Sequence, residues 1–323
     1  MHLFFANALI AMKQVVMLYI IAGLGLAAER LRWFPESTAR LCTKLLLYVV
    51  TPCVVVNSFV NMEYSAEALR GLGISFACGA LLHGVGILIS EPFFRGRKNA
   101  ATESVLHFAA IYGNCGYMGL PLARAMVGDQ GVFYVSVVIL TFQICSFTHG
   151  AYVMSGGVMG RRAPEGEQGV KFQWKNLLLN AGVLSVAVGL PIFLLQIPVP
   201  ALVDTPLASV ASMNSPLAML MFGAYMSRTR LRGLLRSKKL FLTMGMKLFA
   251  LPAVVMSVLL LCGVRGALLN AMLIPAAAPP ANNTVVFAAR HGRDSGYAAQ
   301  VVSLLSLISI VTMPLMIALG LSL

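Results

Sequence analysis

Charged residues are scarce in this sequence. Only 11% of the 323 residues are Asp, Glu, Lys or Arg, whereas an ordinary soluble domain has roughly a quarter. Hydrophobic residues make up 59%. This composition excludes an ordinary soluble protein and indicates a polytopic membrane protein.

The sequence also lacks the usual patterns of enzymes, zinc sites and disulfide frameworks. It contains neither G-x-S-x-G nor H-E-x-x-H, so we expect no intramembrane enzyme. No cysteine has CxxC or CxxH spacing, so we interpret the cysteines as small buried hydrophobic residues and expect no metal or cofactor. The six lie in or beside apolar runs: Cys42, Cys53, Cys78, Cys115, Cys145 and Cys262.

Acidic residues are the rarest charged group, with 11 Asp and Glu against 24 Lys and Arg. We place none of them centrally in a membrane span; Glu103 and Asp129 lie near span ends. This placement argues against a sodium site or a proton relay built on carboxylates. Sodium held by backbone carbonyls stays open as an alternative.

Long apolar runs are abundant. An α-helix needs about 20 apolar residues to cross a hydrocarbon core of roughly 30 Å, whereas a barrel would show short alternating segments. We therefore expect an all-α polytopic membrane protein with ten transmembrane helices. Basic residues follow the first run instead of preceding it, so we treat that run as a retained helix and not as a signal peptide. The runs lie at about 6–28, 41–60, 69–90, 102–126, 131–155, 175–196, 205–227, 240–262, 266–289 and 296–320.

The basic residues are distributed unevenly among the connections. Twenty of the 24 fall near the odd-to-even connections, which the positive-inside rule places in the cytoplasm. Both termini should then face outward. We expect the protein to span the lipid bilayer of a bacterial-type inner (plasma) membrane. The net charge of +13 is therefore a topology signal, and we expect no nucleic-acid partner. The twenty are Arg30, Arg32, Arg40, Lys44, Arg95, Arg97, Lys98, Arg161, Arg162, Lys171, Lys175, Arg228, Arg230, Arg232, Arg236, Lys238, Lys239, Lys247, Arg290 and Arg293.

A polar stretch at 156–174 reads as a cytoplasmic linker between two halves, 1–155 and 175–323. Each half carries five expected spans. An odd number of spans forces the halves into opposite orientations in the membrane. Inverted repeats of this kind are typical of secondary transporters.

Two spans at corresponding places in the halves are interrupted: Gly113 to Pro121 (GNCGYMGLP) and Pro275 to Thr284 (PAAAPPANNT). Proline removes a helix hydrogen bond and displaces the carbonyl four residues earlier. Here the affected carbonyls belong to Tyr117, Pro275 and Ala276. Such groups must be buried in protein or line a wet cavity. We therefore predict a substrate site formed by Gly113, Asn114, Gly116, Tyr117, Pro121, Pro279, Pro280, Asn282 and Asn283.

The chemistry of these stretches favours an anion. Half-helices that meet inside the membrane expose N-terminal N–H groups with partial positive charge. Asn114, Asn282 and Asn283 can donate amide hydrogens to a carboxylate while staying neutral. The glycines at every third position also fit a close helix-packing face, but the recurrence of the break in the second half favours a binding site.

Three histidines fall within the expected spans. His83 lies in a small-residue context, where it reads equally as a functional group or as a neutral imidazole bonded to a neighbouring carbonyl. His107 and His149 lie toward cytoplasmic ends. We interpret these two as solvated interfacial residues in preference to a proton relay.

Two segments carry a resemblance to a known family. GNCGYMGLPLARAMVG and PAAAPPANNTVVFAARHG resemble the auxin efflux carrier family, whose plant members are the PIN proteins and whose bacterial members include malonate- and malate-type carriers. The resemblance implies two inverted five-helix repeats with broken, crossing helices four and nine. It also implies an elevator-like mobile domain (about 69–155 and 240–323) moving against a scaffold (about 1–60 and 175–227), usually in a homodimer.

The chain departs from the plant pattern in three respects. The plant motif has proline where this chain has Gly113, Asn282 and Asn283 replace small residues, and the long cytoplasmic loop is absent. These departures favour a small metabolic carboxylate such as malonate or malate over auxin, although an auxin-like acid stays among the candidates.

The predicted function is secondary transport of such an anion by elevator-like alternating access, with the substrate at the crossing of helices four and nine. The alternatives are a sodium-coupled organic-anion symporter like the bile acid symporter family, and a membrane sensor that uses the same pocket.

Overall fold

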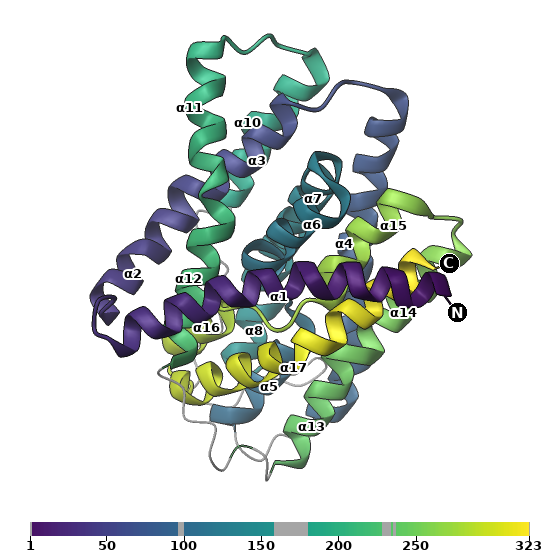
Figure 1. Ribbon diagram of the computed structural model, residues 1–323. Helices are drawn as coiled ribbons and strands as arrows, with labels where there is room; N and C mark the ends of the chain where they lie inside the picture. Colours follow the sequence, from purple (N-terminus) through teal and green to yellow (C-terminus); the bar gives the residue numbers. More distant parts are fainter. Residues whose placement is uncertain (1, 96–99, 158–179, 228–233, 235–236, 323) are drawn as a thin grey trace.

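The computed structural model describes residues 2–95, 100–157, 180–227, 234 and 237–322 (Figure 1). This part of the chain is helical and contains no strand, only an isolated antiparallel bridge between Gly113 and Pro280. Seven of its segments are long and apolar enough to cross a membrane, which confirms an all-helical membrane protein. They are Ala8–Arg30, Leu41–Val60, Ala66–Phe94, Asp129–Met154, Ala201–Ser227, Lys238–Leu261 and Ser295–Leu321.

Several of these segments are composed of shorter helices joined by π-helical turns, labelled η. The first half contains α1 (His2–Arg30), α2 (Glu36–Leu45), η1 (Leu46–Val50), α3 (Thr51–Val60), α4 (Ala66–Phe94), α5 (Ala100–Ile111), η2 (Cys115–Gly119), α6 (Leu120–Val127), α7 (Asp129–Cys145), η3 (Ser146–Gly150) and α8 (Ala151–Met154). The second half contains α10 (Ala181–Leu195), α11 (Ala201–Ser212), α12 (Asn214–Ser227), α13 (Lys238–Gly245), η5 (Met246–Ala250), α14 (Leu251–Leu261), α15 (Gly266–Ala277), α16 (Asn283–Arg290) and α17 (Ser295–Leu321).

The long helices pack closely around the interrupted ones. In Figure 1, α1 crosses the face of the molecule, and the two termini lie side by side. The helix α1 packs against α12 and α17, while α4 packs against α7. A Cβ on Gly25 of α1 would collide with the carbonyl of Leu220, so glycine permits the close approach of α1 to α12.

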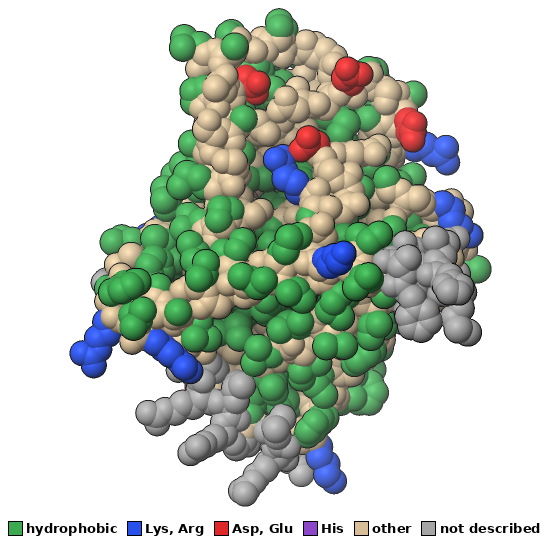
Figure 2. Space-filling view, in the orientation of Figure 1, with side chains coloured by type: hydrophobic (Ala, Val, Ile, Leu, Met, Phe, Trp, Pro, Cys, Tyr) green, Lys and Arg blue, Asp and Glu red, His purple; other side chains and the backbone are tan. Residues whose placement is uncertain are grey.

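Large apolar side chains cover much of the surface. Leu88 is 71% exposed and Leu261 is 87% exposed. Figure 2 shows green side chains over α1 and around it, whereas the visible Asp and Glu side chains gather in the upper part of the view. An apolar surface of this extent fits a lipid environment, not water.

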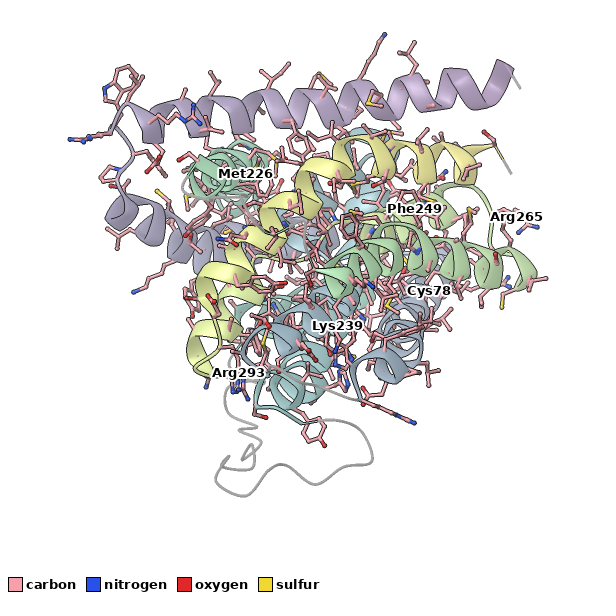
Figure 3. All side chains as sticks on the ribbon, turned by 90° about the horizontal axis from the view of Figure 1, so that it is seen from below. Cys78, Met226, Lys239, Phe249, Arg265 and Arg293 are labelled. Carbon is pink, nitrogen blue, oxygen red and sulfur yellow. The ribbon has the colours of Figure 1, made fainter. Side chains whose placement is uncertain are left out.

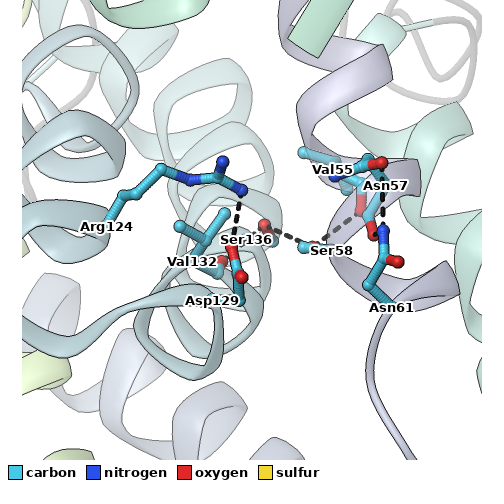
Figure 4. Close-up of polar contacts among 8 residues, drawn as sticks. All are labelled: Val55, Asn57, Ser58, Asn61, Arg124, Asp129, Val132 and Ser136. Carbon is cyan, nitrogen blue, oxygen red and sulfur yellow. Dashed lines mark hydrogen bonds and ion pairs between the residues drawn. The ribbon is translucent and has the colours of Figure 1, made fainter. Parts of the chain in front are cut away.

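The contact between α3 and α7 is polar at one point. The Ser58 and Ser136 hydroxyls lie 3.3 Å apart, and each also donates to a carbonyl of its own helix at 2.7 Å, Val55 or Val132 (Figure 4). Neither hydroxyl depends on the other for a hydrogen-bond partner.

A tight turn at Gly128 precedes α7. Gly128 has φ +79°, a conformation that favours glycine. Beside it, Arg124 and Asp129 form an exposed ion pair at 2.7 Å.

The expectation for the cysteines is only partly correct. Cys78 and Cys115 are buried, but Cys262 is exposed. Cys262 is exposed because it follows the last residue of α14, where that helix ends.

Candidate substrate site at the crossing of two interrupted helices

The first interrupted helix breaks earlier than the proline predicts. The helix α5 ends at Ile111, and the chain resumes as η2 at Cys115. Pro121 does not open the gap, because it lies in the first turn of α6, where a missing N–H is tolerated. The gap is the segment Tyr112–Asn114.

The second interruption lies where the sequence predicts it. The helix α15 ends at Ala277, α16 begins at Asn283, and Pro279 and Pro280 lie in the gap between them. Pro275 is inside α15.

The two gaps pair with each other through their backbones. The amide of Asn114 donates to the carbonyl of Pro279 at 2.7 Å, and the amide of Ala281 donates to the carbonyl of Tyr112 at 2.9 Å. These bonds flank the antiparallel bridge between Gly113 and Pro280. Each gap therefore satisfies backbone groups of the other, as burial away from water requires.

Two amide side chains stand at the start of the resumed helices. Asn114 caps η2, since its Oδ1 accepts a hydrogen bond from the amide of Tyr117 at 3.0 Å. Asn282 occupies the cap position of α16 but makes no capping bond through its side chain. The Nδ2 atoms of both side chains are buried and have no hydrogen-bond partner among the described residues. Two amide donors are thus available beside two helix N-termini.

A cavity of about 50 Å³ lies at this crossing. The predicted residues that line it are Gly113, Asn114, Gly116, Tyr117, Asn282 and Asn283. Pro121, Pro279 and Pro280 do not line it. The two prolines of the second gap act through the backbone bridge instead.

Sequence reasoning missed two polar residues on the cavity wall. Gln143 of α7 is 9% exposed, and its Oε1 has no hydrogen-bond partner in the described part of the chain. Thr51 of α3 donates to Asn214 Oδ1 at 3.5 Å. A lone glutamine within an apolar run was the available signal for Gln143.

The position of Lys247 differs most from the sequence-based expectation. Counted above with a cytoplasmic connection, it is fully buried in η5. It lies nine residues after the start of α13, about 14 Å along a helix. Its Nζ donates to the carbonyl of Ala276 at 3.4 Å, which is one of the carbonyls that the prolines displace. An intramembrane lysine marks a functional site by default.

The ammonium of Lys247 lies directly behind the crossing. A Cβ built on Gly113 would lie 2.7 Å from Nζ and 3.0 Å from the carbonyl oxygen of Pro275. The position is favourable for a cation because the C-terminal end of α15 carries partial negative charge. Gly113 thus lies beside both this ammonium and the cavity of the predicted anion site.

The histidines are more enclosed than the sequence indicates. His83 is buried, with Nδ1 2.6 Å from the carbonyl of Gly79, which supports the bonded-imidazole interpretation. The solvated interpretation of His107 is wrong, because this residue is 1% exposed and lies 3.5 Å from Glu91. His149 is half-buried. Glu91 lies in the last turn of α4, which continues to Phe94, and it is buried although it is not central in the helix.

These features define a class: an α-helical membrane protein in which two interrupted helices cross at a cavity lined in part by asparagine side chains. The chain belongs to the family described as Membrane transport protein, the auxin efflux carrier family, because the family profile matches residues 10–317. The resemblance inferred from the two motifs is thereby confirmed.

A distant relative is also described as a transporter. The chain is 21% identical over 294 residues to an uncharacterized transporter of Methanocaldococcus jannaschii, and the alignment covers 88% of this chain and 91% of the relative.

Proposed function

We propose that this protein is a secondary transporter that moves a small organic carboxylate anion by elevator-like alternating access. The substrate site is the cavity where α5–α6 crosses α15–α16. One observation carries the proposal: two buried amide donors, on Asn114 and Asn282, stand at helix N-termini with the Lys247 ammonium behind them. Donors and positive charge at one place favour a carboxylate.

The proposed topology has ten spans in two inverted repeats, 1–155 and 175–323. Each interrupted helix counts as one span, and α10 (Ala181–Leu195) counts as another. The predicted linker at 156–174 lies almost entirely outside the described residues. The side-by-side termini (Figure 1) support placing both ends on the same side, which the basic residues identify as the outside.

Residues of both the proposed scaffold and the proposed mobile domain line the cavity. Leu47 and Thr51 line the cavity from the proposed scaffold (about 1–60 and 175–227), whereas Asn114, Gln143 and Asn282 line it from the proposed mobile domain (about 69–155 and 240–323). The cavity therefore lies at the boundary that elevator motion would cross. The Ser58–Ser136 contact at this boundary can separate without leaving either hydroxyl unpaired. A homodimer stays a prediction.

The size of the cavity favours a compact substrate. A volume of about 50 Å³ holds a few water molecules, which suits malonate or malate better than an indole-sized, auxin-like acid. The position of Lys247 opposes the sodium-coupled alternative, because its ammonium already occupies the carbonyl-rich end of α15 where a sodium ion held by carbonyls would bind.

Counterflow in proteoliposomes tests this function. Vesicles loaded with unlabelled malonate, malate, lactate or indole-acetate would receive the same labelled acid outside. We expect labelled malonate or malate to accumulate, replacement of sodium by potassium to have no effect, and Lys247→Met to lower the rate at least tenfold, an effect of about 1.4 kcal/mol. Sodium-dependent uptake would favour the symporter alternative. Binding without flux would favour the sensor.

A further inference from the structure

Lys247 is a fully buried amine inside the membrane segment Lys238–Leu261. Phe249, two residues later in the same turn η5, is 45% exposed. It is labelled in Figure 3, which views the molecule from below. The turn therefore has an outer side and an inner side, and Lys247 lies on the inner side. Its side chain does not extend to the membrane surface as the side chains of lysines near helix ends do.

A second lysine of the same segment has the more usual arrangement. Lys239, also labelled in Figure 3, lies in the first turn of α13 and bonds to Glu103 of α5 at 2.5 Å. No carboxylate that the structure describes forms such a pair with Lys247. An ammonium has three N–H groups, and the acceptor that the described residues offer to Lys247 is the carbonyl of Ala276 at 3.4 Å. A buried ammonium of this kind is unfavourable until an anion joins it.

The titratable groups that act electrostatically together with Lys247 are the Cys115 thiol of η2 and the His83 imidazole of α4. The thiol donates to the carbonyl of Gly113 at 3.5 Å. His83 Nδ1 lies 2.6 Å from the carbonyl of Gly79. A thiol that donates a hydrogen bond and an imidazole carry no negative charge, so neither group replaces a carboxylate.

The other helices that pack against η5 provide no counter-ion in the described part of the chain. The helices α14 and α15 contain no titratable side chain. The remaining titratable residues on α4, α5, α13 and α17 are Glu67, Arg70, Cys78, Glu91, Glu103, His107, Lys238, Lys239 and Tyr297. Among the carboxylates, Glu103 pairs with Lys239, Glu91 lies 3.5 Å from His107, and Glu67 lies at the opposite end of α4 from Glu91.

The proposed anion site lies directly beside this amine. A Cβ built on Gly113 would lie 2.7 Å from Nζ. Gly113 and Cys115, the two neighbours of Lys247 in the first interrupted helix, both line the cavity. An acid anion in the cavity would therefore bring a negative charge close to Lys247.

Building on the proposed anion transport, we propose that Lys247 carries the coupling proton: it binds one proton when the acid anion enters and releases it when the acid leaves. The carrier then moves one H⁺ together with each acid molecule. The lone pair of Nζ forms an N–H bond to a proton from water, and this bond breaks again on the other side of the membrane. No redox step is involved.

Two states of the carrier cross the membrane favourably. The empty carrier crosses with a neutral amine, and the loaded carrier crosses with an ammonium beside the anion. A lone buried ammonium, or an anion beside a neutral amine, leaves a charge without a partner in a region of low dielectric constant.

The number of protons is set by the amine and not by the acid. One amine carries one proton, so the ratio is one H⁺ per acid for a monoanion and for a dianion alike. A monoanion then crosses without net charge. A dianion such as malonate carries one net negative charge, which the Asn114 and Asn282 amides and the two helix N-termini help to stabilise.

The first measurement is accumulation driven by a pH gradient. The full-length protein in proteoliposomes would receive the labelled acid that exchanges best among malonate, malate, lactate and indole-acetate, with the outside one pH unit more acidic. Both sides stay near neutral or above, where carboxylic acids are ionised, and potassium with valinomycin holds the membrane voltage at zero. Protein-free liposomes correct for passive entry. One proton per acid supports about tenfold accumulation for each pH unit, whichever charge the acid carries.

Substitutions of Lys247 separate exchange from proton coupling. Lys247→Arg has a positive charge that cannot be removed, so exchange should continue while accumulation falls to a ratio of about one. The residual uptake by Lys247→Met, which has no amine, should also stay at a ratio of about one. The matched control is Lys13→Arg, which replaces an exposed lysine of α1 and should behave like the unmodified protein. Accumulation by Lys247→Arg equal to that of the unmodified protein would overturn the role of Lys247.

The second measurement requires no transport. Nitrogen NMR of the reconstituted protein with labelled lysine, recorded at about pH 8 where exposed lysines are ammonium ions, should contain a neutral-amine signal before any acid is added. This signal should be absent in Lys247→Met and should convert to an ammonium signal when the acid is added.

The two measurements distinguish failure of the proton site from failure of the transport function. Absence of the neutral-amine signal overturns the proton site. Exchange combined with pH-independent accumulation also overturns it, while leaving the proposed transport function intact. The neutral-amine signal without exchange of any acid refutes the proposed transport and retains Lys247 as a proton-binding residue.

Discussion

The first gap contains Gly113 and Asn114, whereas the second contains Pro279, Pro280 and Asn282. In the first, glycine leaves room for the Lys247 ammonium, and an asparagine caps the resumed helix. In the second, two prolines end the helix, and the asparagine makes no capping bond. The comparison shows that the asparagines of the two gaps differ in role. Asn114 makes a capping hydrogen bond through Oδ1 and leaves Nδ2 without a partner among the described residues, whereas Asn282 makes no capping bond and has only the unpartnered Nδ2.

The largest effect is expected at Gly113. An added Cβ would lie 3.0 Å from the carbonyl oxygen of Pro275 and 3.3 Å from that of Ala278. Gly113→Ala should therefore destabilise the fold by about 1–3 kcal/mol, measured as a lower Tm in detergent.

Gly116→Ala is the matched control for this substitution. An added Cβ there meets nothing within 4 Å, so the Tm should change little. Equal Tm values for the two variants would contradict the close packing assigned to the first gap.

Asn114 should show two separable effects. Asn114→Ala removes both the cap and the donor, so we expect a loss of about 1 kcal/mol in stability together with loss of substrate binding. Asn114→Ser keeps a capping oxygen and should preserve the Tm while still losing binding. Tm with and without the substrate acid measures both effects, since a bound ligand raises Tm. Full binding by Asn114→Ser would exclude the amide donor from recognition.

Asn282→Ala should affect binding alone. Its side chain makes no capping bond, so the free energy of unfolding should stay within about 0.5 kcal/mol of the original value. The KM for transport should rise. If Asn282→Ala lowers the Tm as much as Asn114→Ala does, the proposed difference between the gaps is wrong.

The smallest effect is expected at the neighbouring Asn283. It lines the cavity but is the first residue of α16, and among the described residues the buried amide nitrogen without a hydrogen-bond partner belongs to Asn282 and not to Asn283. Asn283→Ala should change KM less than Asn282→Ala does, measured in the same counterflow assay. The opposite order would identify Asn283 as the donor in the second gap.

The sequence predicted the parts of the site that depend on local chemistry. Glycine and proline marked both interruptions, and Asn114 and Asn282 both line the cavity. The exact place of the first break was not predictable from Pro121, because proline is accommodated in the first turn of a helix as readily as in a gap. Gln143 was missed because one polar residue in an apolar run does not reveal which way it faces.

The division between sequence and tertiary structure follows from the range of the forces involved. Hydropathy, positive charge and helix breakers act along the chain, so the sequence by itself determined an all-helical membrane protein with two interrupted helices. Only the tertiary structure decided that Lys247 lies behind Gly113 and that Glu91 lies beside His107. Those contacts join residues that lie far apart in the sequence. The role of a charged residue within a hydrophobic run depends on the groups that pack around it, and the sequence does not show which groups these are.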